Sequence, residues 1–350
     1  MGKVIVTGAA GYIGSHTVVD LLEHGHEVVG VDDFFNSYPS MWEHLERLVG
    51  RPVPLERVDL TDDAAAAAAL ARHADADAVI HFAARIYVNE SVERPLTYFR
   101  HNLRSLVNVL ETVREAGTAA FIFSSSCSVY GNARELPVTE ATPFGEAESA
   151  YARTKQMGEW VVADFARAHP ATQCVNLRYF NPAGVHPSIG IGEAPRQEQS
   201  RLVPLIVEVG AGRRDALKVF GDDYATRDGS CVRDYIHVSD LAHAHTLAVD
   251  FALGGGAARA TANPQVINLG AGEGVTVFEA VAAFERVTGR KLPVEVVGRR
   301  DGDVEAIYST TDGARELLGW APRYGLDEIM RTAWAWEQAR AGMMADPQAA

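Results

Sequence analysis

Short apolar runs alternate with amphipathic segments along the first half of the chain. The amphipathic segments, at residues 12–24, 61–73, 95–116 and 149–169, have the apolar spacing of helices. The apolar runs, at residues 3–7, 27–31, 57–60, 78–83, 121–124 and 174–180, have the length of buried strands. Strands that alternate with helices in this way predict a parallel, doubly wound α/β sheet of the Rossmann type.

The pattern changes after Asn181. Proline and glycine are frequent from residue 182 to 204, and the later apolar runs, at residues 217–221, 235–238, 266–269 and 294–297, are short. We therefore predict a Rossmann domain over residues 1–181 and a smaller mixed α/β domain over residues 182–350. Segments near residues 232–253 are candidates for a return to the first domain.

Composition narrows the classes of function. The chain has 350 residues, which is enough for a sizeable core, and a net charge of -14, which argues against nucleic-acid and anionic-membrane partners. No apolar run approaches the ~20 residues of a membrane span, and the strand pattern begins too early for a signal peptide. Three cysteines without CxxC spacing indicate neither disulfides nor a zinc site. We expect a cytoplasmic protein without a metal.

A glycine run lies between the first predicted strand and the first predicted helix. Gly8, Gly11 and Gly14 form a GxxGxxG pattern, whose glycines let the backbone approach a pyrophosphate at a helix N-terminus. Asp32 ends the next strand, at the spacing of about 20 residues expected for a ribose contact. A carboxylate there would repel a 2′-phosphate, so the pattern predicts NAD rather than NADP; Asp33 could share the role.

The predicted helix at residues 149–169 carries a tyrosine and a lysine four residues apart. Tyr151 and Lys155 therefore lie on one helix face. A free tyrosine has a pKa of about 10, and a nearby cation brings that pKa toward the working range of a base. The strand before this helix ends in Ser124, Ser125 and Ser126, which adds hydroxyl groups beside the same ligand.

Together these motifs resemble the extended short-chain dehydrogenase/reductase family, and within it the UDP-glucose 4-epimerases. The resemblance runs from residue 3 to about residue 336, and its late motifs are more specific than the glycine run. The segments that carry it are VTG at 6–8, IHFA at 80–83, FIFSSS at 121–126, VYG at 129–131, RYFNP at 178–182, GRRD at 212–215, VRDYIHV at 232–238, NLGAG at 268–272 and RRDGD at 299–303.

The resemblance implies epimerisation at C4 of a UDP-hexose of the UDP-glucose/UDP-galactose type. Tyr151 would take the proton from the sugar 4-hydroxyl, and the C4 hydride would pass to NAD and return to the other face of a transient 4-keto sugar. Lys155 would tune Tyr151 and hold the nicotinamide ribose, and Ser126 would bind the sugar 4-oxygen. Relatives also imply a homodimer formed through the helices at 95–116 and 149–169.

The resemblance implies further binding residues. With the three glycines, Asp32, Tyr151 and Lys155, the cofactor would contact Tyr12, Ile13, Asp33, Phe34, Asn36, Ser37, Asp59, Leu60, Phe82, Ala83, Ala84, Ser124, Tyr179 and Phe180. With Ser126 and Tyr151, the nucleotide sugar would contact Asn181, Arg201, Leu202, Lys218, Val219, Phe220, Arg233, Tyr235, Arg300 and Asp303. Among these, Arg233 and Arg300 would bind the diphosphate, because the arginine fork suits phosphate.

Four positions depart from the family pattern and leave the sugar, and the nucleotide, open: Ile86, His101, Arg201 and Ile307. An N-acetylhexosamine, uronate or pentose nucleotide is therefore an alternative substrate. A 4,6-dehydratase is disfavoured, because Cys127 and Ser128 stand where that reaction needs an acid and a base. A non-catalytic NAD-binding sensor is disfavoured because Tyr151, Lys155 and Ser126 are all retained.

Overall fold

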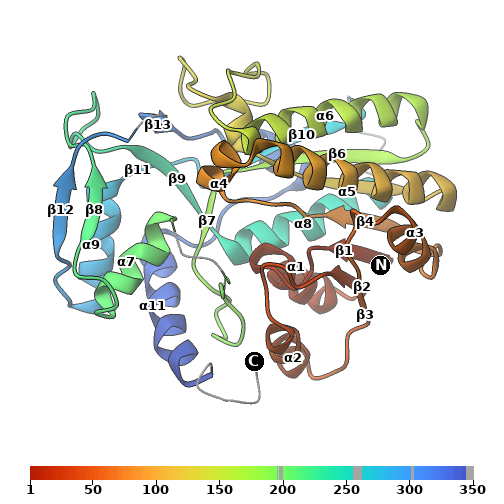
Figure 1. Ribbon diagram of the computed structural model, residues 1–350, viewed down its shortest axis with the longest axis horizontal. Coiled ribbons are helices and arrows are strands. Elements are labelled where there is room, and N and C mark those ends of the chain that lie inside the picture. Colours follow the sequence, from red (N-terminus) through yellow and green to blue (C-terminus); the bar gives the residue numbers. More distant parts are fainter. Residues whose placement is uncertain (195, 197–199, 255–261, 301–302, 344–350) are drawn as a thin grey trace.

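A computed structural model describes residues 1–194, 196, 200–254, 262–300 and 303–343 of the chain. Figure 1 shows a large sheet with helices on both faces, and beside it a smaller part built from later residues. No helix in the described ranges is long and apolar enough to cross a membrane.

The large sheet has seven strands, all paired in parallel. From one edge to the other their order is β10-β6-β5-β4-β1-β2-β3. The chain runs outward from β1 to β3, then returns to the other side of β1 with β4, so the topology reverses between β1 and β4. Ligands of such sheets bind at the carboxyl ends of the strands beside this reversal. The strands are β1 (Lys3–Thr7), β2 (Glu27–Asp32), β3 (Leu55–Arg57), β4 (Ala78–His81), β5 (Ala120–Ser126), β6 (Gln173–Tyr179) and β10 (Gln265–Leu269).

Each face of this sheet has its own apolar core. Within β1, Val4 and Val6 pack toward one face and Ile5 toward the other, as the two-residue period of a strand requires. The first face is covered by α1 (Tyr12–Glu23), α2 (Pro39–Val49) and α8 (Val238–Leu253). The second face is covered by α3 (Asp63–Ala71), α5 (Pro95–Ala116) and α6 (Ala150–Ala168). The short helices α4 (Val88–Glu93) and η1 (Cys127–Tyr130) lie in connections.

The smaller part centres on β9 (Val232–His237). This strand pairs with β7 (Asn181–Ala183), β11 (Gly274–Thr276) and β13 (Ala306–Ile307). A second ribbon pairs β8 (Leu217–Phe220) with β12 (Val294–Val297). A third apolar core lies between these strands and α7 (Leu202–Gly210), α9 (Val277–Thr288) and α11 (Leu326–Met343). The helix α10 (Asp312–Leu318) packs against α8.

The doubly wound sheet predicted from the sequence is confirmed, with differences at its edges. The strand expected at 57–60 is β3, which ends at Arg57, because Asp59 accepts hydrogen bonds from Thr61 in a turn. The helix α2 was not predicted, although Pro39 stands at its first turn. Strand β10 lies after residue 181 yet completes the first sheet, and α8 packs on α1. The domain boundary at residue 181 stays a prediction.

A buried ion pair ties α6 to the centre of the sheet. Arg178 of β6 donates to Glu159 of α6 through Nε at 2.9 Å and Nη2 at 2.7 Å. Both side chains are buried, and Ser125 of β5 also donates to Glu159. Arg178 further donates to the Tyr130 hydroxyl at 2.9 Å, which donates to Asn268 of β10 at 2.6 Å. One network therefore connects the helix that carries Tyr151 to three strands.

Glu159→Gln tests this network. The substitution leaves the Arg178 charge buried without its carboxylate, so we expect the free energy of unfolding to fall by about 3–5 kcal/mol in a denaturant titration. The control is Asp164→Asn, which breaks the exposed pair with Arg167 and should change stability by less than about 0.5 kcal/mol. Similar small losses in both variants would contradict the role of the buried pair.

Candidate active site

The glycine run brings backbone into close contact at the end of β1. Gly8 has a φ of 68°, and a Cβ on it would lie 2.9 Å from the backbone nitrogen of Ala83. A Cβ on Gly14 would lie 2.1 Å from the carbonyl oxygen of Gly8. Gly11 stands at the N-cap of α1 and has no side chain to cap the first turn. The helix N-terminus is thus open to an anion, as pyrophosphate binding requires.

A cavity lies at the carboxyl ends of β1, β2 and β4. All the predicted cofactor residues line it except Phe34 and Phe180. Phe34 is buried in the core around Trp42, and Phe180 packs with Val129 and Ile307, so their proposed cofactor contacts stay predictions. The predicted residues that line the cavity are Gly8, Gly11, Tyr12, Ile13, Gly14, Asp32, Asp33, Asn36, Ser37, Asp59, Leu60, Phe82, Ala83, Ala84, Ser124, Tyr151, Lys155 and Tyr179.

Asp32 is fixed by its own loop. Its Oδ2 accepts the backbone N–H of Ala10 at 2.9 Å, and its Oδ1 accepts the N–H of Phe34 at 2.8 Å and the Ser37 hydroxyl at 3.3 Å. Burial raises the pKa of Asp32, and the two backbone N–H groups oppose that rise. A carboxylate has about four acceptor positions, of which three are in use, so this side chain can still accept a ribose hydroxyl while its charge disfavours a 2′-phosphate.

Helix α6 presents Tyr151 and Lys155 to the same cavity. The helix begins at Ser149, whose hydroxyl accepts the N–H of Ala152 at 3.1 Å. The Lys155 ammonium donates to the Ser124 carbonyl at 2.6 Å and lies 5.8 Å from the centre of the Tyr151 ring. The cap and the bond to β5 therefore fix both side chains at the sheet edge.

Burial dominates the protonation of this pair. It raises the pKa of Tyr151 to about 12, against the opposing effects of a hydrogen bond with Ser126 and the charge of Arg201. It lowers the pKa of Lys155 to about 8, opposed by Glu159. The sequence pointed to Lys155 as the cation that tunes Tyr151, whereas in the structure the lowering charge is that of Arg201. A positive charge bound in the cavity would lower the pKa of Tyr151 further.

Two more predicted residues meet near Tyr151. Ser126 ends β5, accepts the N–H of Ser128 at 3.2 Å and hydrogen-bonds Tyr151, although it does not line the cavity itself. Tyr179 lines the cavity, and its hydroxyl lies 2.5 Å from Nε2 of His245. Since Nδ1 of His245 donates to the Leu241 carbonyl at 2.8 Å, Nε2 accepts the Tyr179 proton.

The predicted diphosphate residues form a separate cluster beside β9. Asp303 accepts from Arg233 and from Arg300, each at 3.0 Å, and Arg300 lies over the Phe220 ring at 5.1 Å. The cluster has two cations for one carboxylate, so a net positive charge remains for an anionic ligand. The structure thus brings Phe220, Arg233, Arg300 and Asp303 together.

The other predicted substrate residues lie in their expected elements. Arg201 is the N-cap of α7, lines the cavity and pairs with Glu193. Leu202 begins α7, and Asn181 of β7 is in register with Tyr235 of β9. In β8, Lys218 is exposed and Val219 is buried in the third core. The contacts of these residues with a substrate stay predictions.

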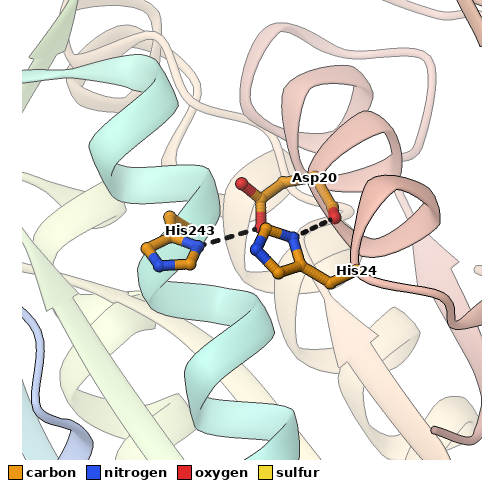
Figure 2. A group of neighbouring side chains, drawn as sticks. All are labelled: Asp20, His24 and His243. Atoms are coloured by element: carbon orange, nitrogen blue, oxygen red, sulfur yellow. Dashed lines mark hydrogen bonds and ion pairs between the residues drawn. The ribbon is translucent and has the colours of Figure 1, made fainter.

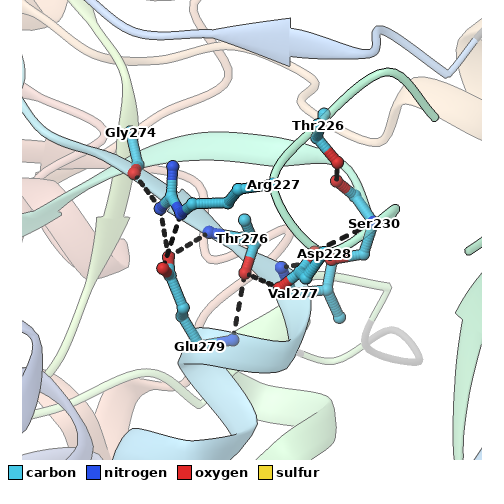
Figure 3. A network of polar contacts seen from close by, with 8 residues as sticks. All are labelled: Thr226, Arg227, Asp228, Ser230, Gly274, Thr276, Val277 and Glu279. Atoms are coloured by element: carbon cyan, nitrogen blue, oxygen red, sulfur yellow. Dashed lines mark hydrogen bonds and ion pairs between the residues drawn. The ribbon is translucent and has the colours of Figure 1, made fainter.

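A polar network that the sequence did not indicate holds the start of β9 (Figure 3). Arg227 donates to Glu279 and, at 2.6 Å, to the Gly274 carbonyl. Thr276 and Glu279 form a capping box at the start of α9, and Thr276 also donates to Asp228. Because Val275 of β11 is in register with Arg233, this network fixes the strand that carries a predicted phosphate ligand.

Sequence reasoning also missed one wall of the cavity. Gly192, Glu193 and Ala194 line it from the irregular stretch after β7. Trp336 of α11 donates to the Glu193 carbonyl at 2.9 Å, and a Cβ on Gly192 would lie 2.6 Å from the Trp336 ring. No spacing pattern marks these residues, because their position depends on a helix more than 130 residues later.

The cavity fits a dinucleotide at both ends. The glycine contacts leave no room for side chains where a pyrophosphate would approach, and Asp32 is fixed where a ribose would lie. Residues 4–270 match the NAD dependent epimerase/dehydratase family. The chain belongs to this family. NAD is the cofactor for which its cavity is built.

Full-length relatives agree with this assignment. The chain is 44% identical over 344 residues to the UDP-glucose 4-epimerase of Mus musculus, covering 97% of each protein. It is similar to the UDP-glucose 4-epimerase of Stenotrophomonas maltophila with bound NAD and formylated UDP-arabinopyranose, at 41% identity and a TM-score of 0.92, covering 98% and 100% of the chains. The Bifidobacterium longum enzyme in complex with NAD+ and UDP follows, at 37% identity and a TM-score of 0.90, covering 97% and 99%.

Lys155→Met tests the buried charge. Below pH 8 the folded chain holds an ammonium that burial disfavours, while the unfolded chain keeps its pKa near 10.5. The wild type should therefore gain stability between about pH 8 and 10.5, where only the unfolded chain binds the proton. At pH 7 the NAD-free variant should be more stable than NAD-free wild type by about 1–3 kcal/mol in urea unfolding, and this difference should shrink toward pH 10.

The control for this prediction is Arg153→Met, on the exposed side of the same helix. It should leave the pH dependence of unfolding unchanged. A Lys155→Met variant that is less stable than the wild type at pH 7, with the same pH dependence, would contradict the buried-charge interpretation.

Proposed function

We propose that the protein catalyses NAD-dependent epimerisation at C4 of a UDP-hexose, interconverting UDP-glucose and UDP-galactose through a transient 4-keto sugar. The observation that carries the proposal is that Tyr151 and Lys155 line the same cavity as the dinucleotide residues, with Ser126 at the end of β5 beside Tyr151. Cys127 and Ser128 follow where a dehydratase needs carboxyl groups, so Tyr151 is the evident proton carrier. The names of the full-length relatives support the same reaction.

Three side chains have separate roles in the proposed reaction. Tyr151 removes the proton from the sugar 4-hydroxyl, and Ser126 holds the 4-oxygen by a hydrogen bond. When bound, NAD would supply the acceptor for the hydride of the sugar C4 and the donor for its return. Lys155, fixed on the Ser124 carbonyl, holds the nicotinamide ribose. Tyr151 then returns its proton to the 4-oxygen of the turned sugar, so one general acid–base group serves both directions.

Arg233 and Arg300 bind the diphosphate in this proposal. Both already contact Asp303, which would accept the nucleotide ribose hydroxyls once the phosphates attract the two guanidinium groups. Arg201 adds a third cation at the boundary between the cavity and α7.

The identity of the sugar is the part of the proposal that the residues constrain least. Ile86, His101 and Arg201 line the cavity and Ile307 is buried with Phe180, so three of the four atypical residues lie at the cavity itself. The Stenotrophomonas maltophila relative holds a pentose nucleotide. An N-acetylhexosamine, uronate or pentose nucleotide is therefore the second candidate.

The reaction is tested with UDP-galactose and no added NAD. We expect UDP-glucose to form, and Tyr151→Phe to slow the conversion at least ~100-fold while keeping bound NAD. Tyr324→Phe, which removes a tyrosine hydroxyl beside His237 and outside the cavity, is a matched control for loss of a hydroxyl. UDP-N-acetylglucosamine, UDP-glucuronate and UDP-arabinose are run in parallel. No conversion of any nucleotide sugar would overturn the proposal, and so would a near-wild-type rate of Tyr151→Phe.

We further propose a homodimer formed through α5 and α6, which lie side by side (Figure 1). Val107 of α5 and Trp160 of α6 are 41% and 55% exposed, which is high for such large apolar side chains. A second copy of the same pair of helices would cover them in a four-helix contact.

Trp160→Glu tests the dimer. Light scattering should give the wild type about twice the 37.8 kDa of one chain, and the variant the mass of one chain. Val296→Glu, at an exposed position of β12, should stay dimeric. A monomeric wild type would contradict the proposal.

The cytoplasm is the proposed location. Cys127, Cys174 and Cys231 are free thiols in the structure, which suits a reducing compartment.

A further inference from the structure

Three potential metal ligands meet on the face of the sheet covered by α1 and α8 (Figure 2). Asp20 belongs to α1, His24 is its C-cap, and His243 belongs to α8. These two helices pack against each other along their length. None of the three residues lines the cavity that holds the catalytic tyrosine.

The spacing of the three groups suits a small tetrahedral cation. Their ligand atoms all lie within 4.8 Å of one another, and Oδ1 of Asp20 is 3.3 Å from Nδ1 of His243. Bonds of about 2.0–2.1 Å to a tetrahedral zinc ion hold neighbouring ligand atoms about 3.3–3.4 Å apart. The Asp20–His243 pair therefore already has the length of one edge of such a tetrahedron.

The neighbouring hydrogen bonds orient these ligands. Nδ1 of His24 donates to the main-chain carbonyl of Asp20 at 2.8 Å, which leaves Nε2 to accept a metal. Thr246 donates to Oδ1 of Asp20 at 2.6 Å. Thr246 thus holds the Asp20 carboxylate in place.

Access and charge also suit a cation. The side chains of His24, His243 and Asp20 are 44%, 22% and 14% exposed, so an ion and its remaining water ligands can enter from solvent. The net charge of the chain is -14, which favours cations in general. The cysteine pattern gave no reason to expect a metal, but this site uses none of the cysteines.

We propose that Asp20, His24 and His243 bind one divalent transition-metal ion of the zinc type, with water completing the coordination. Imidazole and carboxylate ligands suit zinc, whereas magnesium and calcium prefer oxygen ligands. The ion connects the end of α1 to α8. It thereby joins His24 and His243, which are 219 residues apart in the sequence. Its role is structural, because it lies outside the cavity.

The experiment uses the NAD-bound protein after treatment with a chelator. Titration calorimetry with ZnCl2 should give one equivalent bound, and a hundredfold excess over Kd should raise the Tm by at least ~2 °C. MgCl2 should have no effect. His243→Gln and His24→Gln should each weaken zinc binding at least ~10-fold and remove most of the shift, relative to the metal-free Tm of the same variant.

The matched control is His73→Gln. His73 contacts a carboxylate in the same way, with Nε2 3.0 Å from Glu56, but it has no third ligand within the described residues. This variant should bind zinc like the wild type. The proposal is overturned if the wild type binds no zinc, or if His243→Gln and His24→Gln bind it as the wild type does, which would mean that the aspartate only pairs with the two histidines.

Discussion

The parallel direction of the seven strands is the constraint on which the site depends. It places every carboxyl end at one edge of the sheet, so Gly8, Asp32 and Ser124 meet there although they are far apart in the sequence. The reversal of strand order between β1 and β4 opens the cavity at that edge. Helix α6 must then lie over β5 for Tyr151 to reach the same place, and the Arg178–Glu159 pair fixes it there.

The burial that forms the cavity also opposes the proton transfer that we propose for Tyr151. Without a cofactor it moves the pKa of Tyr151 to about 12 and that of Lys155 to about 8, each toward its neutral form. A tyrosine in this state is a poor base at pH 7. The positive nicotinamide of NAD+ would reverse part of this effect, since an adjacent cation favours the phenolate. In the proposed reaction, Tyr151 would therefore act as a base chiefly when the oxidised cofactor is in place.

The sequence predicted the parts of the fold that follow from local patterns. Gly8 and Gly14 are marked by spacing alone, and the structure gives each a contact that a side chain would block. The predicted helix at 61–73 also has a local start signal, since the side chain of Asp62 accepts the N–H of Ala65 and caps α3. Such features need only a strand, a turn and a helix, so a few residues determine them.

The parts that the sequence did not predict depend on distant partners. Glu193 reaches the cavity because α11 supports its backbone, and Phe34 is directed into the core by the turn around Asp32. The pairing of His243 with Asp20 requires α8 to cross back to the first sheet. Tertiary packing determines all three of these positions. The periodicity of the sequence does not predict it.

In the proposed substrate site, the constraint is the balance of charge among three side chains. Arg233, Arg300 and Asp303 carry a net positive charge, and their ion pairs hold the side chains in place before any ligand arrives. A diphosphate would replace one carboxylate with a stronger anionic partner, and Asp303 would turn to the ribose without a change in the backbone. Since Arg227 and Glu279 hold the strand beside Arg233, we expect this exchange to leave β9 in place. A rigid phosphate end and a less constrained sugar end are what a substrate needs if it is to turn about its phosphate linkage between two hydride transfers.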